Sequence, residues 1–316
     1  MASNVAPAPR VSVIIPAYNR ADLLPATLES VFAQGWREFE IVVVDDGSTD
    51  GTAALLASYG DRIRWVSQQN RGVAAARNRG IREARGAFLA FLDSDDLWEP
   101  DALGKIMQAF EDHPDAGLVA IMAREITAAG ERTGIVYGKR TPGPFFSTAG
   151  LLWGDQGGCS WFVVRRDVLE RVGLYDESLR SAEECDLCLR LSFVTRMVVV
   201  REPLLLRRAH PGNLSRNRLT NARHWIRILE KLRRDHPEFV RAHPRAYRRT
   251  LGKELLRLGR GLLASGAGGA SHAEARSALA RSIRTFPFFP RAWLYLVWAL
   301  LAPTTFRRWR GADGTP

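Results

Sequence analysis

The sequence predicts an α/β fold, a doubly wound and mostly parallel sheet, with a C-terminal α-helical extension. Over residues 11–122, short apolar runs alternate with segments of helical spacing. Unbroken apolar runs are typical of strands buried on both faces, and strand–helix alternation is typical of parallel sheets. From about residue 216 onward the chain is basic and helical in pattern. We therefore expect the sheet first and the helices after it.

The expected elements follow the apolar pattern in chain order. Strands are predicted at 11–16, 40–44, 62–66, 88–92, 117–122, 159–165 and 197–206. Helices are predicted at 21–34, 52–58, 70–85, 100–110, 181–193 and 291–302, with further helices after 216. The glycine run at 265–271 follows a helix rather than a strand, so it predicts a linker between helices and not a phosphate loop.

Charge divides the chain into two parts of different character. The net charge is +11, but residues 201–316 hold 24 basic and 7 acidic residues, a net of +17, so the first 200 residues carry −6. We expect a disordered N-terminus at 1–9, one domain at 10–215 and a basic helical region at 216–316. The basic region suggests an anionic partner, either a phospholipid surface or nucleic acid.

Other sequence features bear on the compartment. Residues 1–10 lack the apolar core of a secretory signal, and no run of apolar residues is long enough to span a bilayer. The three cysteines are too few for a disulfide scaffold, which favours a reducing compartment. We therefore expect a cytoplasmic protein, with a peripheral place on the inner face of the plasma membrane if the basic region binds lipid.

The segment Phe88–Leu97 is the most informative part of the sequence. Five apolar residues run directly into Asp93, Asp95 and Asp96. Clustered carboxylates are costly to bury because they repel one another, so they indicate a shared cation or a helix cap. Asp93 and Asp95 are two residues apart and leave an extended segment on the same side, which suits a hard divalent ion. We expect Asp96 to cap the following helix.

Polar clusters also follow the first two strands, with Tyr18 after one and Asp45 and Asp46 after the other. Ligands of such sheets bind outside the carboxyl ends of the strands, so these clusters should share one crevice with the aspartates. A nucleoside diphosphate with its cation fits this set. Tyr18 would stack on the base, and Asp45 or Asp46 would accept a hydrogen bond from an imide of the base. Asp93 would accept hydrogen bonds from the ribose hydroxyls, and Asp95 would bind the ion.

Four segments together resemble the inverting glycosyltransferases of family 2, which have the A-type glycosyltransferase fold. They are Val11-Ser-Val-Ile-Ile-Pro-Ala-Tyr-Asn19, Val44-Asp-Asp-Gly-Ser-Thr-Asp50, Asn70-x-Gly72 with Ala76-Arg-Asn78, and Phe91-Leu-Asp-Ser-Asp-Asp96. Each is weak alone, but their order and spacing are specific, and the resemblance covers about residues 10–215. It implies a catalytic domain with a nucleotide-sugar half at 10–122 and an acceptor half at 123–215.

The resemblance implies a role for each matching residue. The nucleotide-binding residues would be Pro16, Tyr18, Asp45, Asp46, Arg77, Asp93 and Ser94. Asp93-Ser94-Asp95 matches the Asp-x-Asp signature, with Asp95 as the direct ligand of Mn²⁺ or Mg²⁺, and His210 matches a late histidine that completes the metal site.

The catalytic base is where this sequence departs from the family. Members typically carry Glu-Asp-x-Asp-Leu, whereas this chain reads Glu183-Glu-Cys-Asp-Leu187, so Glu184 takes the base position. The longer side chain displaces the carboxylate, which matters at a reacting centre. Glu183 and Asp186 are the alternatives, and Trp161 is a candidate on the acceptor side or a core residue.

These residues imply a metal-dependent transferase that moves a sugar from a nucleoside-diphosphate sugar, UDP favoured, to a hydroxyl of a glycan or lipid-linked acceptor. Cell-surface polysaccharide synthesis is the expected setting. A non-catalytic nucleotide-sugar binder is the main alternative. Nucleic-acid binding rests on charge alone, and the chain lacks Gly-x-Gly-x-x-Gly and the phosphate-loop motif, which argues against dehydrogenase and ATPase classes. The segment 291–310 further resembles an interfacial helix that would contact an anionic membrane.

Overall fold

The structure is a computed structural model that describes residues 9–138, 144–153, 161–210, 212, 217–265 and 268–301. The chain divides into two compact units. The first comprises residues 1–151 and 155–212, and the second comprises 152–154 and 213–316. The predicted disordered N-terminus lies almost entirely outside the described residues.

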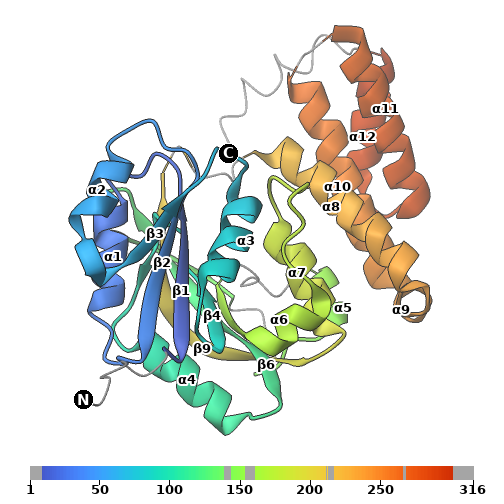
Figure 1. Ribbon diagram of the computed structural model, residues 1–316. Helices are drawn as coiled ribbons and strands as arrows, with labels where there is room; N and C mark the ends of the chain where they lie inside the picture. Colours follow the sequence, from blue (N-terminus) through green and yellow to red (C-terminus); the bar gives the residue numbers. More distant parts are fainter. Residues whose placement is uncertain are drawn as a thin grey trace, which may run out of the picture. The chain divides into compact units, whose positions relative to one another are not determined.

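The first unit is built on one nine-stranded mixed sheet (Figure 1). Its strand order is β3-β2-β1-β4-β8-β6-β9-β5, with β7 paired to β6. The strands are β1 (Val11–Ala17), β2 (Phe39–Asp45), β3 (Arg64–Ser67), β4 (Phe88–Phe91), β5 (Leu97–Trp98), β6 (Ala116–Thr127), β7 (Arg132–Tyr137), β8 (Phe162–Arg165) and β9 (Arg196–Ala209). Strands β1 to β4 are mutually parallel, whereas β8 is antiparallel to β4 and β6. The predicted α/β sheet with C-terminal helices is confirmed.

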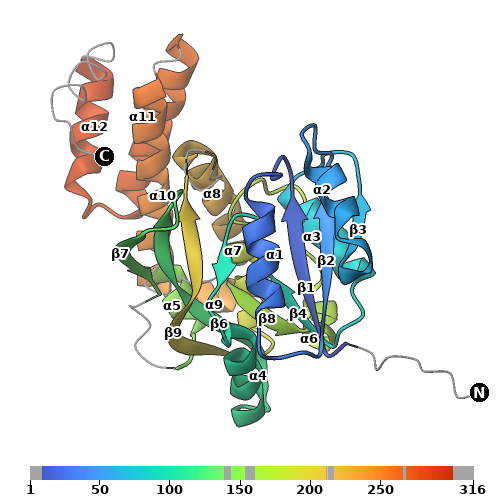
Figure 2. The same cartoon turned by 90° about the vertical axis from the view of Figure 1, so that its left-hand side faces the viewer.

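Helices cover both faces of this sheet, as the alternating pattern predicted. They are α1 (Leu24–Phe32), α2 (Thr52–Ser58), the short 3₁₀ helix η1 (Gly60–Arg62), α3 (Val73–Glu83), α4 (Ala102–Asp112), α5 (Thr148–Trp153), α6 (Arg166–Val172) and α7 (Glu183–Ser192). Figures 1 and 2 show α1 and α3 on opposite sides of β1 and β2. Alternate residues of β1 therefore face different layers: Val13 joins the core under α1 and α4, and Ile14 faces α3.

The longest strands extend beyond the apolar runs that predicted them. Strand β6 continues to Thr127, five residues past the predicted end at Met122. Arg124 and Glu125 interrupt the hydrophobic pattern, but their backbones still pair with β9 on one side and β7 lies on the other. Backbone hydrogen bonds to the neighbouring strands therefore continue β6 beyond the point where the hydrophobic pattern of its side chains ends. The predicted boundary between two halves at residue 122 falls inside this continuous strand.

The second unit is a group of helices. They are α8 (Arg218–Asp235), α9 (Pro237–Ala242), α10 (Pro244–Ser265), α11 (Gly268–Thr285) and α12 (Pro290–Leu301). Helix α10 packs against α8 and α11, and α12 packs against α11 and α10. The side chain of Asn217 caps α8 by accepting from the Thr220 N–H at 3.1 Å.

The predicted linker at 265–271 is wrong in extent, because α11 already begins at Gly268. Glycine destabilises a helix through its backbone entropy, by roughly 0.5–1 kcal/mol relative to alanine in the helix interior, and Gly268 and Gly269 lie at the start of α11 instead. The helix gains its stability further along, where Gly259 of α10 lets α11 approach closely: a Cβ there would meet Leu279 Cγ at 2.6 Å. Close helix packing therefore outweighs the local glycine content. Among the described residues, no helix is both long enough and apolar enough to cross a bilayer.

Gly80 in α3 and Gly104 in α4 have different surroundings, and comparing them tests how closely α3 packs on the sheet. A Cβ at Gly80 would meet Ile14 Cγ2 of β1 at 2.4 Å, whereas a Cβ at Gly104 of α4 would meet nothing within 4 Å. We expect Gly80→Ala to lower the free energy of unfolding by about 1–3 kcal/mol through overpacking. Gly104→Ala should raise it by about 0.5–1 kcal/mol through helix propensity alone. Urea denaturation of both variants measures the contrast, and equal effects would refute the close approach of α3 to β1.

Candidate active site

The carboxyl ends of three neighbouring strands bring the predicted polar clusters to one edge. Strands β2, β1 and β4 are adjacent and parallel, with Ala17 in register with Asp45, and Ile14 with Phe91. Tyr18, Asp46 and Asp93 therefore leave the sheet at the same end. This confirms the expectation that the clusters share an edge, and it follows from parallel pairing alone.

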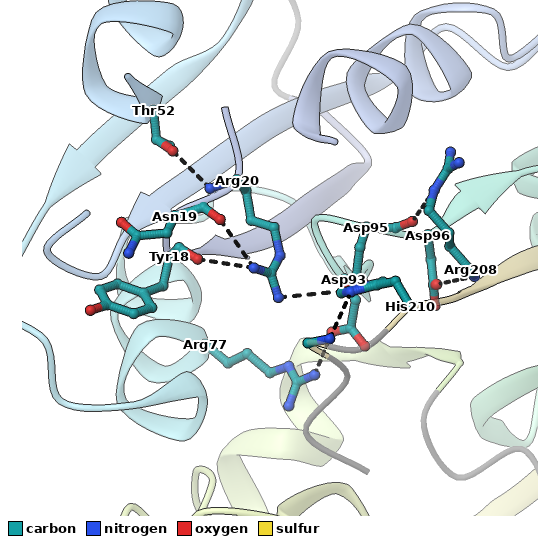
Figure 3. Close-up of polar contacts among 11 residues, drawn as sticks. Tyr18, Asn19, Arg20, Thr52, Arg77, Asp93, Asp95, Asp96, Arg208 and His210 are labelled. Atoms are coloured by element: carbon teal, nitrogen blue, oxygen red, sulfur yellow. Dashed lines mark hydrogen bonds and ion pairs between the residues drawn. The ribbon is translucent and has the colours of Figure 1, made fainter. Parts of the chain in front are cut away.

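The segments after β1 and β2 are joined by hydrogen bonds. Asn19 has a left-handed backbone with φ 52°, which asparagine tolerates better than most residues. Its backbone N–H donates to Ser48 Oγ at 2.9 Å, and its Oδ1 accepts from the Thr49 N–H at 2.8 Å. Tyr18 remains 44% exposed beside this junction. The exposed ring is thus held next to a loop fixed by hydrogen bonds, and Figure 3 shows Tyr18 beside Asn19 and Arg20.

Asp45 and Asp46 are buried and shape the loop that precedes α3. Both oxygens of Asp46 are engaged: Oδ1 accepts from Gln68 Nε2 at 2.8 Å and from the Arg71 N–H at 3.0 Å, and Oδ2 accepts from the Gly72 N–H at 2.8 Å. Asp45 accepts from the Ser48 N–H at 3.0 Å and from Ser67 Oγ at 3.2 Å. Asp46 therefore holds the loop that precedes α3 in its conformation. Pro16 is buried within β1.

Arg77 of α3 is the centre of the site. Its side chain is 3% exposed, and its Nη1 lies 2.6 Å from Glu183 Oε1. Its Nη2 lies 2.7 Å from Asp93 Oδ1 and 2.6 Å from Glu184 Oε1. Burial alone would lower the pKa of this guanidinium, but the charges of Glu184, Asp93 and Glu183 outweigh it and raise the pKa well above its ordinary value. Arg77 is thus a buried cation shared by three carboxylates.

Tyr175 completes the surroundings of this cation. The Arg77 guanidinium carbon lies 5.5 Å from the centroid of its ring, and the ring meets Phe91 edge-on. Burial raises the pKa of the Tyr175 hydroxyl well above its ordinary value. Within the described part of the chain, the Tyr175 hydroxyl oxygen, Arg77 Nε and Glu183 Oε2 are buried without a hydrogen-bond partner. Sequence analysis did not identify Tyr175, because no local motif marks it.

The aspartates after β4 form the second half of the site. Ligand oxygens of Asp93, Asp95 and Asp96 all lie within 4.8 Å of one another. His210 Nε2 lies 2.8 Å from Asp95 Oδ2, so the structure brings together the two residues that the resemblance named as metal ligands (Figure 3). Arg20 approaches the same oxygen at 3.6 Å. Ser94 is buried between the two aspartates.

Electrostatic strain in this cluster favours a cation. Partial removal of the Asp93 carboxylate from water raises its pKa, although the side chain is still 37% exposed; the charge of Arg77 opposes this rise and that of Asp95 reinforces it. Burial also raises the pKa of Asp96 well above its ordinary value, with the charges of Asp93 and Asp95 adding to the effect. Carboxylate oxygens and an imidazole nitrogen are suitable ligands for Mg²⁺ or Mn²⁺, and a bound ion would relieve the repulsion. The residues present therefore fit a divalent cation.

The prediction that Asp96 caps the following helix is wrong. Helix α4 begins at Ala102, and its N-cap residue, Asp101, makes no side-chain capping bond. Asp96 Oδ1 instead accepts from the Arg208 N–H at 2.9 Å, and Arg208 Nε donates to the Asp95 carbonyl at 3.2 Å. These bonds tie the aspartate loop to the end of β9, immediately before His210. The partner lies 112 residues away in the sequence, which no local capping rule could reveal.

The remaining predicted residues have different surroundings. Glu183 and Glu184 begin α7 and both reach Arg77. Asp186 is buried and accepts from Arg190 Nε at 2.8 Å within the same helix. Trp161 is 8% exposed and belongs to the hydrophobic core, with its ring 5.9 Å from that of Tyr137. The structure thus favours the core interpretation of Trp161 over an acceptor contact.

Solved structures with a similar fold identify the fold of this chain. Staphylococcus aureus TarS (residues 1–349), solved in complex with UDP-GlcNAc, matches with a TM-score of 0.67 at 20% identity, covering 95% of this chain and 89% of that one. Mannosyltransferase PcManGT from Pyrobaculum calidifontis, in complex with GDP-Man and Mn²⁺, matches with a TM-score of 0.59 at 22% identity, covering 96% and 88%. The fold is therefore that of the A-type glycosyltransferases.

Sequence comparison then gives the family. The chain belongs to glycosyl transferase family 2, whose model matches residues 12–173, and it is a glycosyltransferase. An uncharacterized glycosyltransferase of Rickettsia typhi is 27% identical over 234 residues, covering 71% of this chain and 73% of that protein. A putative teichuronic acid biosynthesis glycosyltransferase, TuaG of Bacillus subtilis, is 44% identical over 104 residues, or 32% and 41% of the two chains.

The raised pKa of Asp96 makes a prediction about stability. A carboxyl whose pKa is higher in the folded than in the unfolded state costs stability as pH rises through that range. Asp96→Asn keeps the acceptor for the Arg208 N–H and removes the charge. In EDTA at pH 8 we expect its Tm to exceed that of the wild type by a few degrees, the scale of about 1 kcal/mol in a domain of this size.

The gain should shrink as pH falls, because Asp96 of the wild type then becomes protonated. Asp61→Asn, at an exposed position, is the control and should leave the Tm unchanged. Differential scanning calorimetry across pH measures both. A lower Tm for Asp96→Asn at pH 8 without metal would contradict the electrostatic account.

Proposed function

We propose that this enzyme transfers a sugar, with inversion, from a UDP-sugar to a hydroxyl of a glycan or lipid-linked acceptor in cell-surface polysaccharide synthesis. One observation carries the proposal: Arg77 joins the aspartate cluster after β4 to the two glutamates that begin α7. The donor-binding and acceptor-activating groups are thereby held against one another. The name of the TuaG relative and the UDP-GlcNAc complex of TarS support the substrate class.

The donor would lie along the carboxyl edge of β2, β1 and β4. The exposed ring of Tyr18 is free to stack on a base, beside Pro16 and the buried Asp45. Asp93 gives one oxygen to Arg77 and, with its side chain 37% exposed, is accessible to a ribose hydroxyl. The neighbouring Ser94 belongs to the same nucleotide-binding segment. Arg20, which lies 3.6 Å from Asp95, supplies positive charge for the diphosphate and was not identified from the sequence.

Asp95 and His210 would hold the divalent ion, with Asp93 and Asp96 close by. When bound, Mn²⁺ or Mg²⁺ supplies positive charge that stabilises the leaving diphosphate. Arg208 keeps the aspartate loop beside His210 through its bonds to Asp95 and Asp96. These contacts fix the positions of the ligand side chains before donor binds.

Glu184 would act as the general base on the acceptor. Its carboxylate removes the proton of the attacking hydroxyl, whose oxygen approaches the anomeric carbon from the face opposite the diphosphate. The ion pair with Arg77 holds one oxygen of Glu184 in place, at a position where family members usually carry the shorter aspartate. Arg77 is too deeply buried to be a main phosphate contact, so its role is to position Asp93 and Glu184.

The reaction is proposed to occur in the cytoplasm, at the inner face of the plasma membrane. The net charge of +17 over residues 201–316 supports a location beside anionic lipid. A lipid-linked acceptor would be present at the same surface.

Glu184→Gln separates catalysis from binding. We expect UDP release from the preferred member of a UDP-, GDP- and dTDP-sugar panel to fall about 10²–10⁴-fold, as removal of a general base does. Donor affinity with Mn²⁺, measured by isothermal titration, should stay within about threefold, because the substituted group contacts the acceptor. Glu170→Gln, at an exposed position of α6, is the matched control.

Asp95→Asn should instead weaken the binding of the donor and its ion, since it removes a metal ligand. The thermal stabilisation by UDP and Mn²⁺ that we expect for the wild type should be absent in this variant. Full transfer by Glu184→Gln would refute its role as base. Selective UDP-sugar binding by a wild type that turns over no donor would favour the non-catalytic alternative.

A further inference from the structure

Helix α12 presents an apolar face to solvent. It packs on α11 and α10 through Ala292, Tyr295 and Ala299, which are buried, and Figures 1 and 2 both show it beside α11. The opposite side carries five large residues that are each at least 50% exposed: Trp293, Leu294, Val297, Leu300 and Leu301. At about 100° per residue these positions cover an arc of roughly 120°. We call them the α12 outer face.

This face contains no polar side chain, which is unusual for an exposed helix. A helix on the surface of a globular unit normally directs polar residues to water. Here Arg291 is the one charged residue of α12, and it lies in the first turn beside the arc. Phe288, just before the helix, is 78% exposed and extends the apolar surface. Contiguous exposed apolar surface of this kind marks a binding site.

The charge around the face indicates what binds there. From residue 275 to residue 312 the sequence contains seven arginines and no aspartate or glutamate. Two of them are exposed: Arg284 in the last turn of α11 and Arg291 in the first turn of α12. Aromatic and aliphatic side chains enter the headgroup–acyl boundary of a bilayer, while neighbouring arginines bind anionic headgroups.

We infer that the α12 outer face docks on the surface of an anionic lipid bilayer. Trp293, Leu294 and Val297 insert at the interface, and Arg284 and Arg291 contact phosphate headgroups. Both signals are needed, because a small apolar face or a few charges alone bind membranes weakly. The inference rests on the membrane location in the proposed function and names the surface that would provide it, but its test is independent of the reaction, since vesicle binding requires neither donor nor acceptor.

A second copy of the chain is a less suitable occupant of the face. A two-fold interface pairs the same surface of each protomer. Both protomers would then bring the arginines of residues 275–312 to one interface, with no acidic residue in that stretch to neutralise them. Like charges brought together oppose association, whereas anionic lipid complements them.

Vesicle flotation of the full chain tests the inference, using phosphatidylcholine vesicles with and without phosphatidylglycerol. We expect the wild type to float with the anionic vesicles and to stay in solution with the neutral ones. The triple variant Leu294→Ser, Val297→Ser, Leu301→Ser should bind at least about tenfold more weakly. Arg284→Gln with Arg291→Gln should weaken binding to a similar degree and remove its dependence on phosphatidylglycerol.

The matched control is Ile135→Ser with Val194→Ser, two apolar residues of the first unit that are 48% and 42% exposed. This variant should bind vesicles as the wild type does. All substituted side chains are exposed, so thermal denaturation should show intact folding for each variant.

Undiminished flotation of the triple variant, or no wild-type flotation, would overturn the inference. So would a dimer in sedimentation that the triple variant abolishes without any vesicle binding. None of these three results would bear on transfer, which Glu184→Gln tests separately.

Discussion

A single buried guanidinium organises the active centre. Arg77 reaches Asp93 at the end of β4 and Glu183 and Glu184 at the start of α7, two segments about 90 residues apart in the sequence. An unpaired arginine in this position would be strongly destabilising, and so would three carboxylates without it. Such a network adds little net stability compared with apolar packing, but it fixes geometry. Its value to the enzyme is that the aspartate proposed to bind the donor and the glutamates proposed to face the acceptor occupy defined positions relative to one another.

The sheet provides the frame in which this interaction is possible. Parallel pairing of β2, β1 and β4 places their carboxyl ends together, and the fit of Gly80 against Ile14 brings α3 close enough for Arg77 to reach that edge. On the other side of the aspartates, β9 runs parallel to β6, and its end places Arg208 beside Asp96 and His210 beside Asp95. The aspartate cluster is therefore held from two directions, by α3 and by the end of β9. Its residual negative charge is what a divalent ion would neutralise.

Much of this arrangement could be predicted from the sequence, and the exceptions share a cause. Apolar runs before Tyr18, Asp45 and Asp93 located three strand ends, and parallel pairing then implied a common edge. The pairing of Asp95 with His210 followed from the family resemblance. In contrast, the partners of Arg77 and Asp96 are set by tertiary contacts over 106 and 112 residues, which carry no local signal. A local rule therefore suggested a helix cap for Asp96, and the family resemblance placed Arg77 among the nucleotide-binding residues without indicating its carboxylate partners. Trp161 shows the same limit, since an aromatic residue near the start of a predicted strand gives no sign of whether the core will enclose it.

Two double-mutant cycles test the bridging role of Arg77 most directly. Arg77→Gln would be combined with Asp93→Asn in one cycle and with Glu184→Gln in the other, and free energies of unfolding would be measured in urea without metal. If the guanidinium joins both carboxylates, each cycle should give a favourable coupling energy above about 1 kcal/mol, as contacting buried charges do. Coupling to Glu184 with less than about 0.5 kcal/mol to Asp93 would contradict the account, because Arg77 would then serve α7 alone.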